Sequence, residues 1–235
     1  MLQSIKDIRH VMYINLESRP DRKELLLTEL SKLNLECSPI WFKAIKTTNG
    51  AVGCTLSHIR CLEIAKEQNW PHLLLVEDDI EFTDPNLFVC SLNTFLKSNT
   101  PWNVVLVAGN NAGPYRFIPS CAAQVIGCQT TTGYMVKSDY YDSLITNYKE
   151  GLTKLMREPH LRINYAIDRY WFSLQKKDLW YLIYPLTVTQ RSDYSDIEGR
   201  EVNYNKMMLT LDKSTWNIKP PSPKMTSPKM NYSTK

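Results

Sequence analysis

The hydrophobic positions along this chain form short apolar runs that alternate with amphipathic stretches. Residues 11–16, 73–76 and 102–109 are apolar with little polar alternation, which is typical of strands covered on both faces. Residues 18–34 and 50–70 carry apolar side chains at helical spacing. This alternation predicts an α/β fold with a mostly parallel central sheet.

Local signals refine the two N-terminal helices. Ser18 and Asp21 have the spacing of a capping box, and Pro20 is tolerated in a first turn. Gly50 and Gly53 are expected to break the chain before the second helix. The predicted inner faces consist of Leu26, Leu30 and Leu33 in the first helix and Ile59, Leu62 and Ala65 in the second.

Further elements continue the alternation as far as residue 211. We expect extended segments at 38–45, 129–136 and 180–190, and helices at 86–96, 138–148 (capped by Ser138) and 164–175. After residue 211 the pattern dissolves into a stretch rich in proline, lysine and serine, in which "SPKM" occurs twice. The sequence therefore predicts one domain over 1–211 and a flexible tail over 212–235.

The charge distribution argues against nucleic acid as a partner. The chain carries 28 basic and 24 acidic residues, a net charge of +4. The tail from Asp212 onward holds five of the lysines and one acid, which leaves 23 basic and 23 acidic residues in the body. Because the body is formally neutral, we predict no binding to DNA or RNA.

Cysteine usage and the N-terminus are typical of an intracellular protein. The six cysteines have irregular spacings without a CxxC pair, so they indicate neither a zinc site nor a disulfide framework, and we expect free, mostly buried thiols. The first ten residues lack the apolar region of a signal peptide, and no run is long enough to span a membrane. We expect a cytoplasmic protein without a membrane span, and peripheral membrane association stays open.

Three consecutive acids, Glu77, Asp78 and Asp79, follow the apolar run 73–76. Like charges side by side raise one another's pKa unless a cation or several donors compensate them. Ligands of open parallel sheets bind beyond the carboxyl ends of the strands, where these acids would lie. A divalent metal that holds a diphosphate fits this position, and a solvated turn is the plainer alternative.

Six segments occur along the chain in a recognisable order. They are "INLESRPDR" (14–22), "GCTLSHIRCLEIA" (53–65), "LLLVEDDIEF" (73–82), "QTTTGYMV" (129–136), "AIDRYW" (166–171) and "TQRSDYSDI" (189–197). Together they resemble glycosyltransferase family 25, which includes lipooligosaccharide galactosyltransferases of lipopolysaccharide biosynthesis and their procollagen relatives. The resemblance covers residues 10–197.

That resemblance implies a GT-A type, Rossmann-like fold, a UDP-galactose or UDP-glucose donor, and Mn²⁺ or Mg²⁺ as cofactor. The "EDD" triplet stands where the family has its short acidic motif, with Glu77 and Asp79 as the outer carboxylates. We expect Asp79 to bind the metal directly, and Glu77 or Asp78 to contact the ribose or a metal-bound water. A metal that bridges the phosphates stabilises the charge that develops on the leaving diphosphate.

The remaining site residues follow from the same comparison. Asn15, Leu16, Arg19 and Arg22 belong to the first motif, and either arginine could pair with phosphate or be a surface charge. Ser57 and His58 match a Ser-His pair of the family, which implies contact with the donor or the metal, although a lone histidine near a helix start is more often structural.

Two acids nearer the C-terminus complete the prediction. The resemblance implies transfer with inversion, which needs a general base, and Asp168 is the candidate; the alternative is a surface acid paired with a neighbouring arginine. Asp196 either binds the metal or orders a loop over the donor.

The sequence therefore predicts a metal-dependent hexosyltransferase that acts on a hydroxyl acceptor, either a glycan or a hydroxylated protein side chain. An inactive relative that binds the nucleotide sugar or serves a partner enzyme is the alternative. A metal-dependent nuclease fits less well, because the body is neutral and no second cluster of acids and histidines accompanies the triplet.

Overall fold

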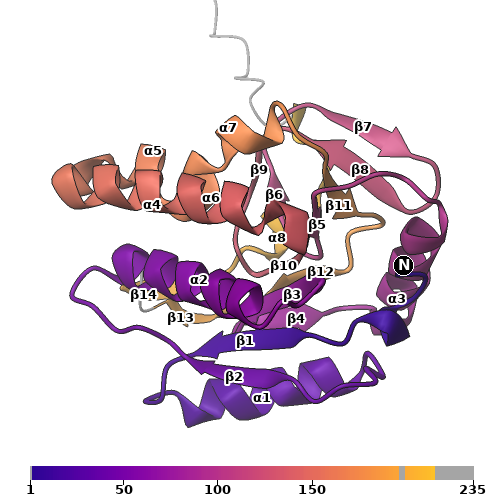
Figure 1. Ribbon diagram of the computed structural model, residues 1–235, viewed down its shortest axis with the longest axis horizontal. Coiled ribbons are helices and arrows are strands. Elements are labelled where there is room, and N and C mark those ends of the chain that lie inside the picture. The colour runs from indigo at the N-terminus through magenta and orange to yellow at the C-terminus, as the bar shows by residue number, and fades with distance from the viewer. Residues whose placement is uncertain (1, 196–198, 215–235) are drawn as a thin grey trace, which may run out of the picture.

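The computed structural model describes residues 2–195 and 199–214, and its centre is an eight-stranded sheet (Figure 1). The strand order is β2-β1-β3-β10-β5-β11-β8-β7. In chain order these strands are β1 (Val11–Asn15), β2 (Ile40–Lys43), β3 (His72–Glu77), β5 (Val104–Leu106), β7 (Tyr115–Ile118), β8 (Ala122–Val125), β10 (Gly133–Lys137) and β11 (Trp180–Ile183).

Six of these eight strands run in the same direction. Strand β1 is parallel to β2 and β3, and β11 is parallel to β5. Strand β10 is antiparallel to both β3 and β5, and β8 is antiparallel to both β11 and β7, so only β10 and β8 are reversed within this sheet. This confirms the α/β class and the mostly parallel central sheet.

Helices cover both faces of the sheet (Figure 1). The long ones are α1 (Pro20–Ser31), α2 (Gly50–Glu67), α3 (Pro85–Lys97) and α4 (Tyr141–Arg157). Side chains of α2 and α4 share one hydrophobic cluster, and side chains of α1 and α3 share the other. In β3, Leu73 and Leu75 belong to the first cluster, whereas Leu74 and Val76 belong to the second. The strand lacks polar alternation because both of its faces are buried.

Three pairs of short strands lie beyond the carboxyl ends of the parallel strands, and short helices occur at both ends of the sheet. The short strands are β4 (Ile80–Phe82), β6 (Asn110–Asn111), β9 (Cys128–Gln129), β12 (Val188–Gln190), β13 (Asp193–Ser195) and β14 (Arg200–Val202). They form the pairs β4·β12, β6·β9 and β13·β14. The short helices are η1 (Ile5–Asp7), η2 (Ser138–Tyr140), η3 (Pro159–Leu161), α5 (Arg162–Tyr165), α6 (Ile167–Tyr170), α7 (Phe172–Gln175) and α8 (Asn205–Met208).

Several predicted helix ends were wrong. Arg19, not Ser18, precedes α1, because Pro20 is its first residue, and no side chain caps this end. Ser138 begins the turn η2 rather than capping α4. The helix expected over 164–175 is divided among α5, α6 and α7. The inner faces were predicted correctly, since Leu26, Leu30, Leu33, Ile59, Leu62 and Ala65 are all buried.

The two glycines expected to break the chain lie inside α2. Asn49 caps this helix, and its side chain accepts a hydrogen bond from the amide of Ala51 at 3.1 Å. A Cβ atom on Gly53 would collide with the carbonyl oxygen of Ile45. Gly53 therefore allows the loop after β2 to pack closely against the first turn of α2, which shapes one wall of the site described below.

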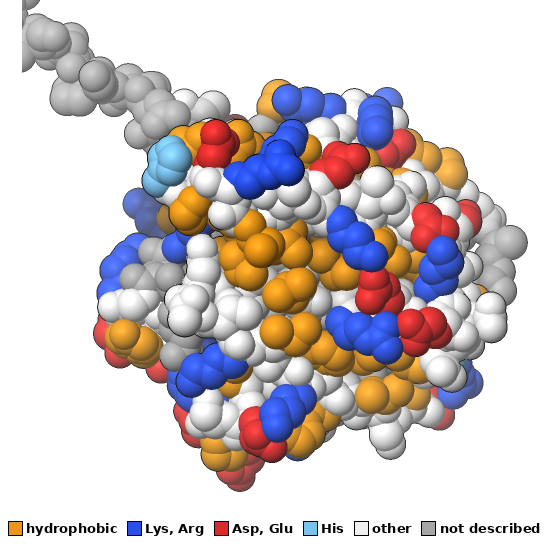
Figure 2. All heavy atoms as spheres, turned by 60° about the vertical axis from the view of Figure 1, so that its left-hand side comes forward, with side chains coloured by type: hydrophobic (Ala, Val, Ile, Leu, Met, Phe, Trp, Pro, Cys, Tyr) orange, Lys and Arg blue, Asp and Glu red, His pale blue; other side chains and the backbone are white. Residues whose placement is uncertain are grey.

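All six cysteines are free, and Cys61, Cys121 and Cys128 are buried. Within the described residues, every helix is too short or too polar to cross a membrane. Figure 2 shows one face of the molecule, where Lys and Arg side chains are interspersed with Asp and Glu around a central group of hydrophobic side chains.

The domain boundary predicted after residue 211 stays a prediction. Leu211 is buried, and Lys213 donates a hydrogen bond to the carbonyl oxygen of Asn111 at 2.5 Å. Residues 215–235 of the predicted tail lie outside the described part of the chain, as does Asp196.

Candidate active site

The three acids lie at the carboxyl edge of the sheet, as predicted. Strands β1 and β3 are parallel neighbours, and Ile14 pairs with Glu77, so Asn15 and the acids emerge side by side. Asp78 and Asp79 form the tight turn that leads into β4. This edge is where α/β proteins place their ligands.

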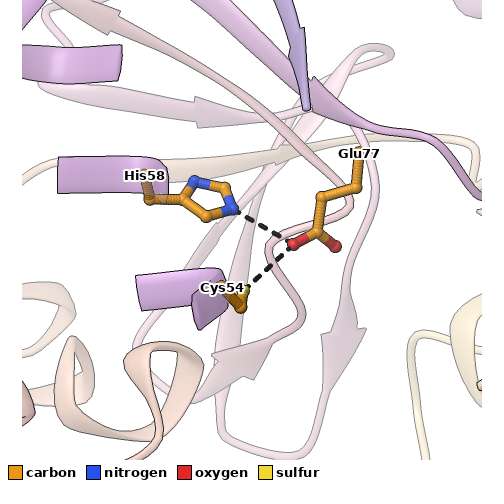
Figure 3. A group of neighbouring side chains, drawn as sticks. All are labelled: Cys54, His58 and Glu77. Atoms are coloured by element: carbon orange, nitrogen blue, oxygen red, sulfur yellow. Dashed lines mark hydrogen bonds and ion pairs between the residues drawn. The ribbon is translucent and has the colours of Figure 1, made fainter. Parts of the chain in front are cut away.

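Glu77 is held by three donors from two other segments. Its Oε1 accepts hydrogen bonds from His58 Nε2 at 3.1 Å, Cys54 Sγ at 3.4 Å and Thr131 Oγ1 at 2.9 Å. Cys54 and His58 lie on successive turns of α2 and both point toward this carboxylate (Figure 3). Burial acts to raise the pKa of Glu77, but the hydrogen bonds and the nearby imidazole outweigh it and keep this pKa below its usual value.

Asp78 is compensated by groups from the N-terminal part of the chain. Its Oδ2 accepts from Asn15 Nδ2 at 2.8 Å, and its Oδ1 accepts from Arg22 Nη1 at 3.2 Å. Burial nevertheless raises the pKa of Asp78. Asp78 therefore ties β3 to β1 and to the start of α1, and its carboxylate oxygens are already used inside the protein.

Asp79 differs from its two neighbours in having a buried oxygen without a partner among the described residues. Its Oδ2 accepts from Gln190 Nε2 at 3.1 Å, whereas its Oδ1 is buried and has no hydrogen-bond partner among the described residues. Burial, together with the charges of Glu77 and Asp78, raises the pKa of Asp79 well above its usual value. A buried carboxylate oxygen of this kind suits a divalent cation, which prefers oxygen ligands and would offset the clustered charge.

The two arginines of the first motif converge on one carboxylate. Arg22 Nε lies 3.0 Å and Arg19 Nη2 lies 3.1 Å from Oδ2 of Asp193, at the start of β13. These ion pairs join α1 to the "SDYSDI" segment, which the sequence identified as a motif without indicating its partner. Asp193 thus occupies, in this structure, the position where the arginines could meet an anionic ligand.

Two cavities flank the acids. The smaller, of about 300 Å³, is lined by the end of β1 including Leu16, the loop 44–48, Arg22, Asp78 and Asp79. The larger, of about 520 Å³, is lined by Asn110, residues 129–131 and residues 162–163 and 166–169. Both are lined by Cys54, Glu77, Gln190, Ser195 and Tyr204. The two cavities therefore share one wall, which carries the carboxylate of Glu77.

Asp168 faces the larger cavity, across from the acids. Its Oδ2 accepts a hydrogen bond from the backbone N–H of Thr130 at 3.1 Å, and Thr130 has a positive φ of 75°. Burial raises the pKa of Asp168, and the charge of Glu77 adds to the effect. The structure thus brings Asp168 to the site, although it lies 91 positions after Glu77.

The Ser-His pair lies on α2, and Ser57 is among the residues around the smaller cavity, whereas His58 lies behind it. Ser57 is fully buried, and its hydroxyl accepts from the amide of Ile45 at 2.9 Å and donates to the carbonyl of Gly53 at 2.8 Å. His58 is also fully buried, between Glu77 and the hydroxyl of Tyr134 at 3.0 Å from Nδ1. Direct contact of either residue with a donor stays a prediction, and the observed role of Ser57 is to hold the loop after β2.

Three site residues were missed in the sequence. Cys54 lies four residues before His58, which is the spacing of neighbours on one helix face, and this spacing is the signal that could have identified it. Thr131 belongs to a recognised motif without an assigned role. Gln190 reaches Asp79 across 111 positions, and no local pattern signals that contact.

The arrangement defines an α/β protein with a ligand site beyond the carboxyl ends of its strands. Residues 43–104 match the family described as glycosyltransferase family 25 (LPS biosynthesis protein). The resemblance to that family is thereby confirmed over a segment that includes Ser57, His58 and the three acids, and the match supports a glycosyltransferase function. Asp168 and the "SDYSDI" segment lie outside it.

Comparison with curated proteins yields no match. Solved structures similar to this chain include the glycosyltransferase GlyE of Streptococcus pneumoniae TIGR4, with 11% identity, a TM-score of 0.46 and coverage of 76% of this chain and 46% of that one. A mannose-1-phosphate geranyltransferase from Thermus thermophilus has 11% identity, a TM-score of 0.44 and coverage of 75% and 73%.

A third similar structure is a glycosyltransferase involved in glycosylation of the major capsid of PBCV-1, with 10% identity, a TM-score of 0.40 and coverage of 75% and 93%. This chain therefore spans about half the length of the GlyE structure and most of the PBCV-1 structure. Structural similarity at these identities and TM-scores does not identify a function.

Proposed function

We propose that the protein is a metal-dependent glycosyltransferase of GT-A type that transfers a hexose from a UDP-sugar to a hydroxyl group of a glycan or a hydroxylated protein side chain. The observation that carries the proposal is the pair of cavities that meet at Glu77, the smaller of which is also lined by Asp79 with its buried oxygen that has no partner among the described residues. The family match over residues 43–104 supports the same reaction class.

The smaller cavity suits the nucleotide part of the donor. It lies beyond the end of β1 and is bounded by the loop 44–48, which the hydroxyl of Ser57 and the close approach at Gly53 hold in place. Arg22 lines it, and Arg19 contacts Asp193, which also lines it. The geometry of guanidinium groups suits phosphate oxygens. In this arrangement a diphosphate would replace the carboxylate of Asp193 as the anion that both arginines contact.

Asp79 is the residue best placed to hold Mn²⁺ or Mg²⁺. When bound, such a cation supplies a Lewis acid that stabilises the negative charge developing on the leaving diphosphate. Gln190 fixes the orientation of Asp79 by donating to its other oxygen. Three donors bind Oε1 of Glu77, and this hydrogen-bonded carboxylate shapes the junction between the two cavities.

Asp168 is the proposed general base. In a transfer with inversion, the acceptor oxygen attacks the anomeric carbon from the face opposite the diphosphate, so its base must lie on the acceptor side. Asp168 lines the larger cavity, and the amide of Thr130 binds one of its oxygens. The acceptor hydroxyl gives its proton to this carboxylate while the bond between the sugar and UDP breaks. A raised pKa suits this task, because a base is most effective when its pKa approaches the working pH.

A screen of UDP-sugars with Mn²⁺, in which UDP release is measured without an added acceptor, tests the proposal. We expect slow release from one or two hexose donors, and the Asp79→Ala variant should lower it by about a hundred- to a thousandfold. UDP binding without release from any donor would favour the alternative, an inactive nucleotide-sugar-binding protein. Near-normal release by the variant would contradict the assignment of Asp79.

A further inference from the structure

The two α2 residues that bind Glu77, Cys54 and His58, form with it a cluster of three possible metal ligands. Cys54 Sγ, His58 Nε2 and a carboxylate oxygen of Glu77 all lie within 4.8 Å of one another (Figure 3). Sulfur, imidazole nitrogen and carboxylate oxygen are the three ligand types that zinc takes in proteins. This set differs from the carboxylate oxygen that Asp79 offers, which suits harder cations.

We propose that Cys54, His58 and Glu77 form a binding site for zinc or a similar borderline-soft divalent cation, separate from the cation position at Asp79. The proposal goes beyond the transferase reaction and does not depend on it.

The geometry requires little movement. Zinc bonds of 2.0–2.3 Å in a tetrahedral arrangement place ligand atoms about 3.3 to 3.8 Å apart. The carboxylate oxygen of Glu77 is 3.1 Å from His58 Nε2 and 3.4 Å from Cys54 Sγ, so these pairs are already close to that spacing. Cys54 and His58 are one helical turn apart on α2, and Glu77 ends β3, so two rigid elements carry the ligands.

Charge balance also favours a cation there. Loaded with Zn²⁺, the site would combine a thiolate and a carboxylate with a neutral imidazole, so the two negative charges and the cation cancel. Without metal, burial and also the charge of Glu77 raise the pKa of the Cys54 thiol. The thiol therefore keeps its proton and donates a hydrogen bond to Glu77. Binding of Zn²⁺ forms the sulfur–metal bond and releases this proton to the buffer.

Tyr134 supplies the outer partner that a zinc-bound histidine needs. With a neutral imidazole in the metal-free arrangement, His58 Nε2 donates to Glu77 and Nδ1 accepts from the Tyr134 hydroxyl, 3.0 Å away. For coordination Nε2 must offer its lone pair, and the proton then sits on Nδ1 and is donated to the oxygen of Tyr134. A hydroxyl both donates and accepts, so Tyr134 serves either tautomer without moving.

The fourth position of the proposed site would face the cavities. Cys54 and Glu77 line both of them, whereas His58 is fully buried behind. Three protein ligands and one open position are typical of zinc sites that exchange their fourth ligand, in contrast to closed structural sites.

Cobalt titration of the purified, chelator-treated protein tests this inference directly, because Co²⁺ bound by thiolate has a characteristic charge-transfer absorption. We expect one Co²⁺ per chain with this absorption, loss of the signal when Zn²⁺ is added, and no such loss with an equal excess of Mg²⁺. The Cys54→Ser variant should lack the absorption and bind Zn²⁺ at least about a hundredfold more weakly, and Tyr134→Phe should keep the absorption but bind about tenfold more weakly.

Cys90→Ser is the matched control, because Cys90 is exposed on α3 and should not affect binding. A second measurement uses the unaltered protein, in which Zn²⁺ should slow alkylation of Cys54 but not of Cys90. A cobalt complex without thiolate absorption, or equal alkylation of Cys54 with and without Zn²⁺, would overturn the proposal. Neither result would bear on Mn²⁺-dependent release of UDP, so the two proposals can fail separately.

Discussion

Replacing Asp79 with asparagine should stabilise the metal-free protein at neutral pH, although most changes to buried polar residues destabilise proteins. The carboxylate of Asp79 is buried beside Glu77 and Asp78, and its Oδ1 has no partner among the described residues. Asparagine keeps an oxygen that can accept from Gln190 Nε2 and removes the charge. A buried group left uncompensated costs about 1 to 3 kcal/mol, so the variant should gain about that much free energy of unfolding.

The sign of the pH dependence follows from the raised pKa of Asp79. The folded protein binds the proton of this carboxyl more tightly than the unfolded chain, for which the ordinary value is 3.8. Stability of the unaltered protein therefore falls as the pH rises from 3.8 through the folded-state pKa. The advantage of Asp79→Asn should be small near pH 4 and should grow toward neutral pH.

Denaturant unfolding in the presence of a chelator measures both the gain in free energy of unfolding and its dependence on pH. In a thermal melt, each kcal/mol gained corresponds to a melting temperature about 2 to 4 °C higher for a chain of this length. Asp78→Asn is the matched control. Burial raises the pKa of Asp78 too, but both of its oxygens accept hydrogen bonds, from Arg22 and Asn15. An amide NH2 group there would face one of these donors, so the same substitution should destabilise the protein by about 1 to 3 kcal/mol. Destabilisation by Asp79→Asn, or a gain that does not change with pH, would refute the reasoning.

Two further predictions concern Asp168 and His72. Asp168→Asn should keep the affinity for UDP and Mn²⁺, measured calorimetrically, while transfer to an acceptor falls by about a hundred- to ten-thousandfold; a parallel loss of UDP affinity would move Asp168 into the donor site. Burial of His72 lowers its pKa to about 4 from 6.5. As the pH falls, this imidazole is therefore protonated in the unfolded chain before it is protonated in the folded protein. The free energy of unfolding of the unaltered protein should therefore fall by about 2 to 3 kcal/mol between pH 6.5 and pH 4, and the His72→Gln variant should not show this fall. Superimposable pH profiles of unfolding for the two proteins would contradict this.

The sequence predicted the parts of the fold that depend on burial. Leu26 and Leu30 repeat at helical spacing because one face of α1 packs on the sheet, and Leu33 is buried just beyond the end of this helix. The run 73–76 lacks alternation because both faces of β3 are covered. Helix starts were predicted less well. Ser18 had the residue type of a cap, but the fixed φ of Pro20 favours the first helical position, which makes Arg19 the preceding residue.

The site was predictable where its residues follow one another along the chain. The three acids could be placed at a strand end from the pattern alone, but their different states could not. Glu77, Asp78 and Asp79 differ because α2, α1 and β12 each supply donors to one of them. Those contacts depend on how helices pack across the sheet, which spacing along the sequence does not determine. For the same reason, the meeting of Cys54 and His58 with Glu77 was not foreseen.

The reversed strand β10 has a consequence for how the protein folds. Because β10 runs against β3, its first residues meet the last residues of β3, and Thr131 reaches Glu77 across 54 positions. Gln190 must then arrive on β12, 111 positions after Asp79. Contacts between such distant positions form late, since closing long loops costs entropy before it is repaid. A chain emerging from the ribosome would therefore carry Asp79 without its Gln190 partner until β12 is made, after the last strand of the central sheet, so completion of this contact would report completion of the whole sheet.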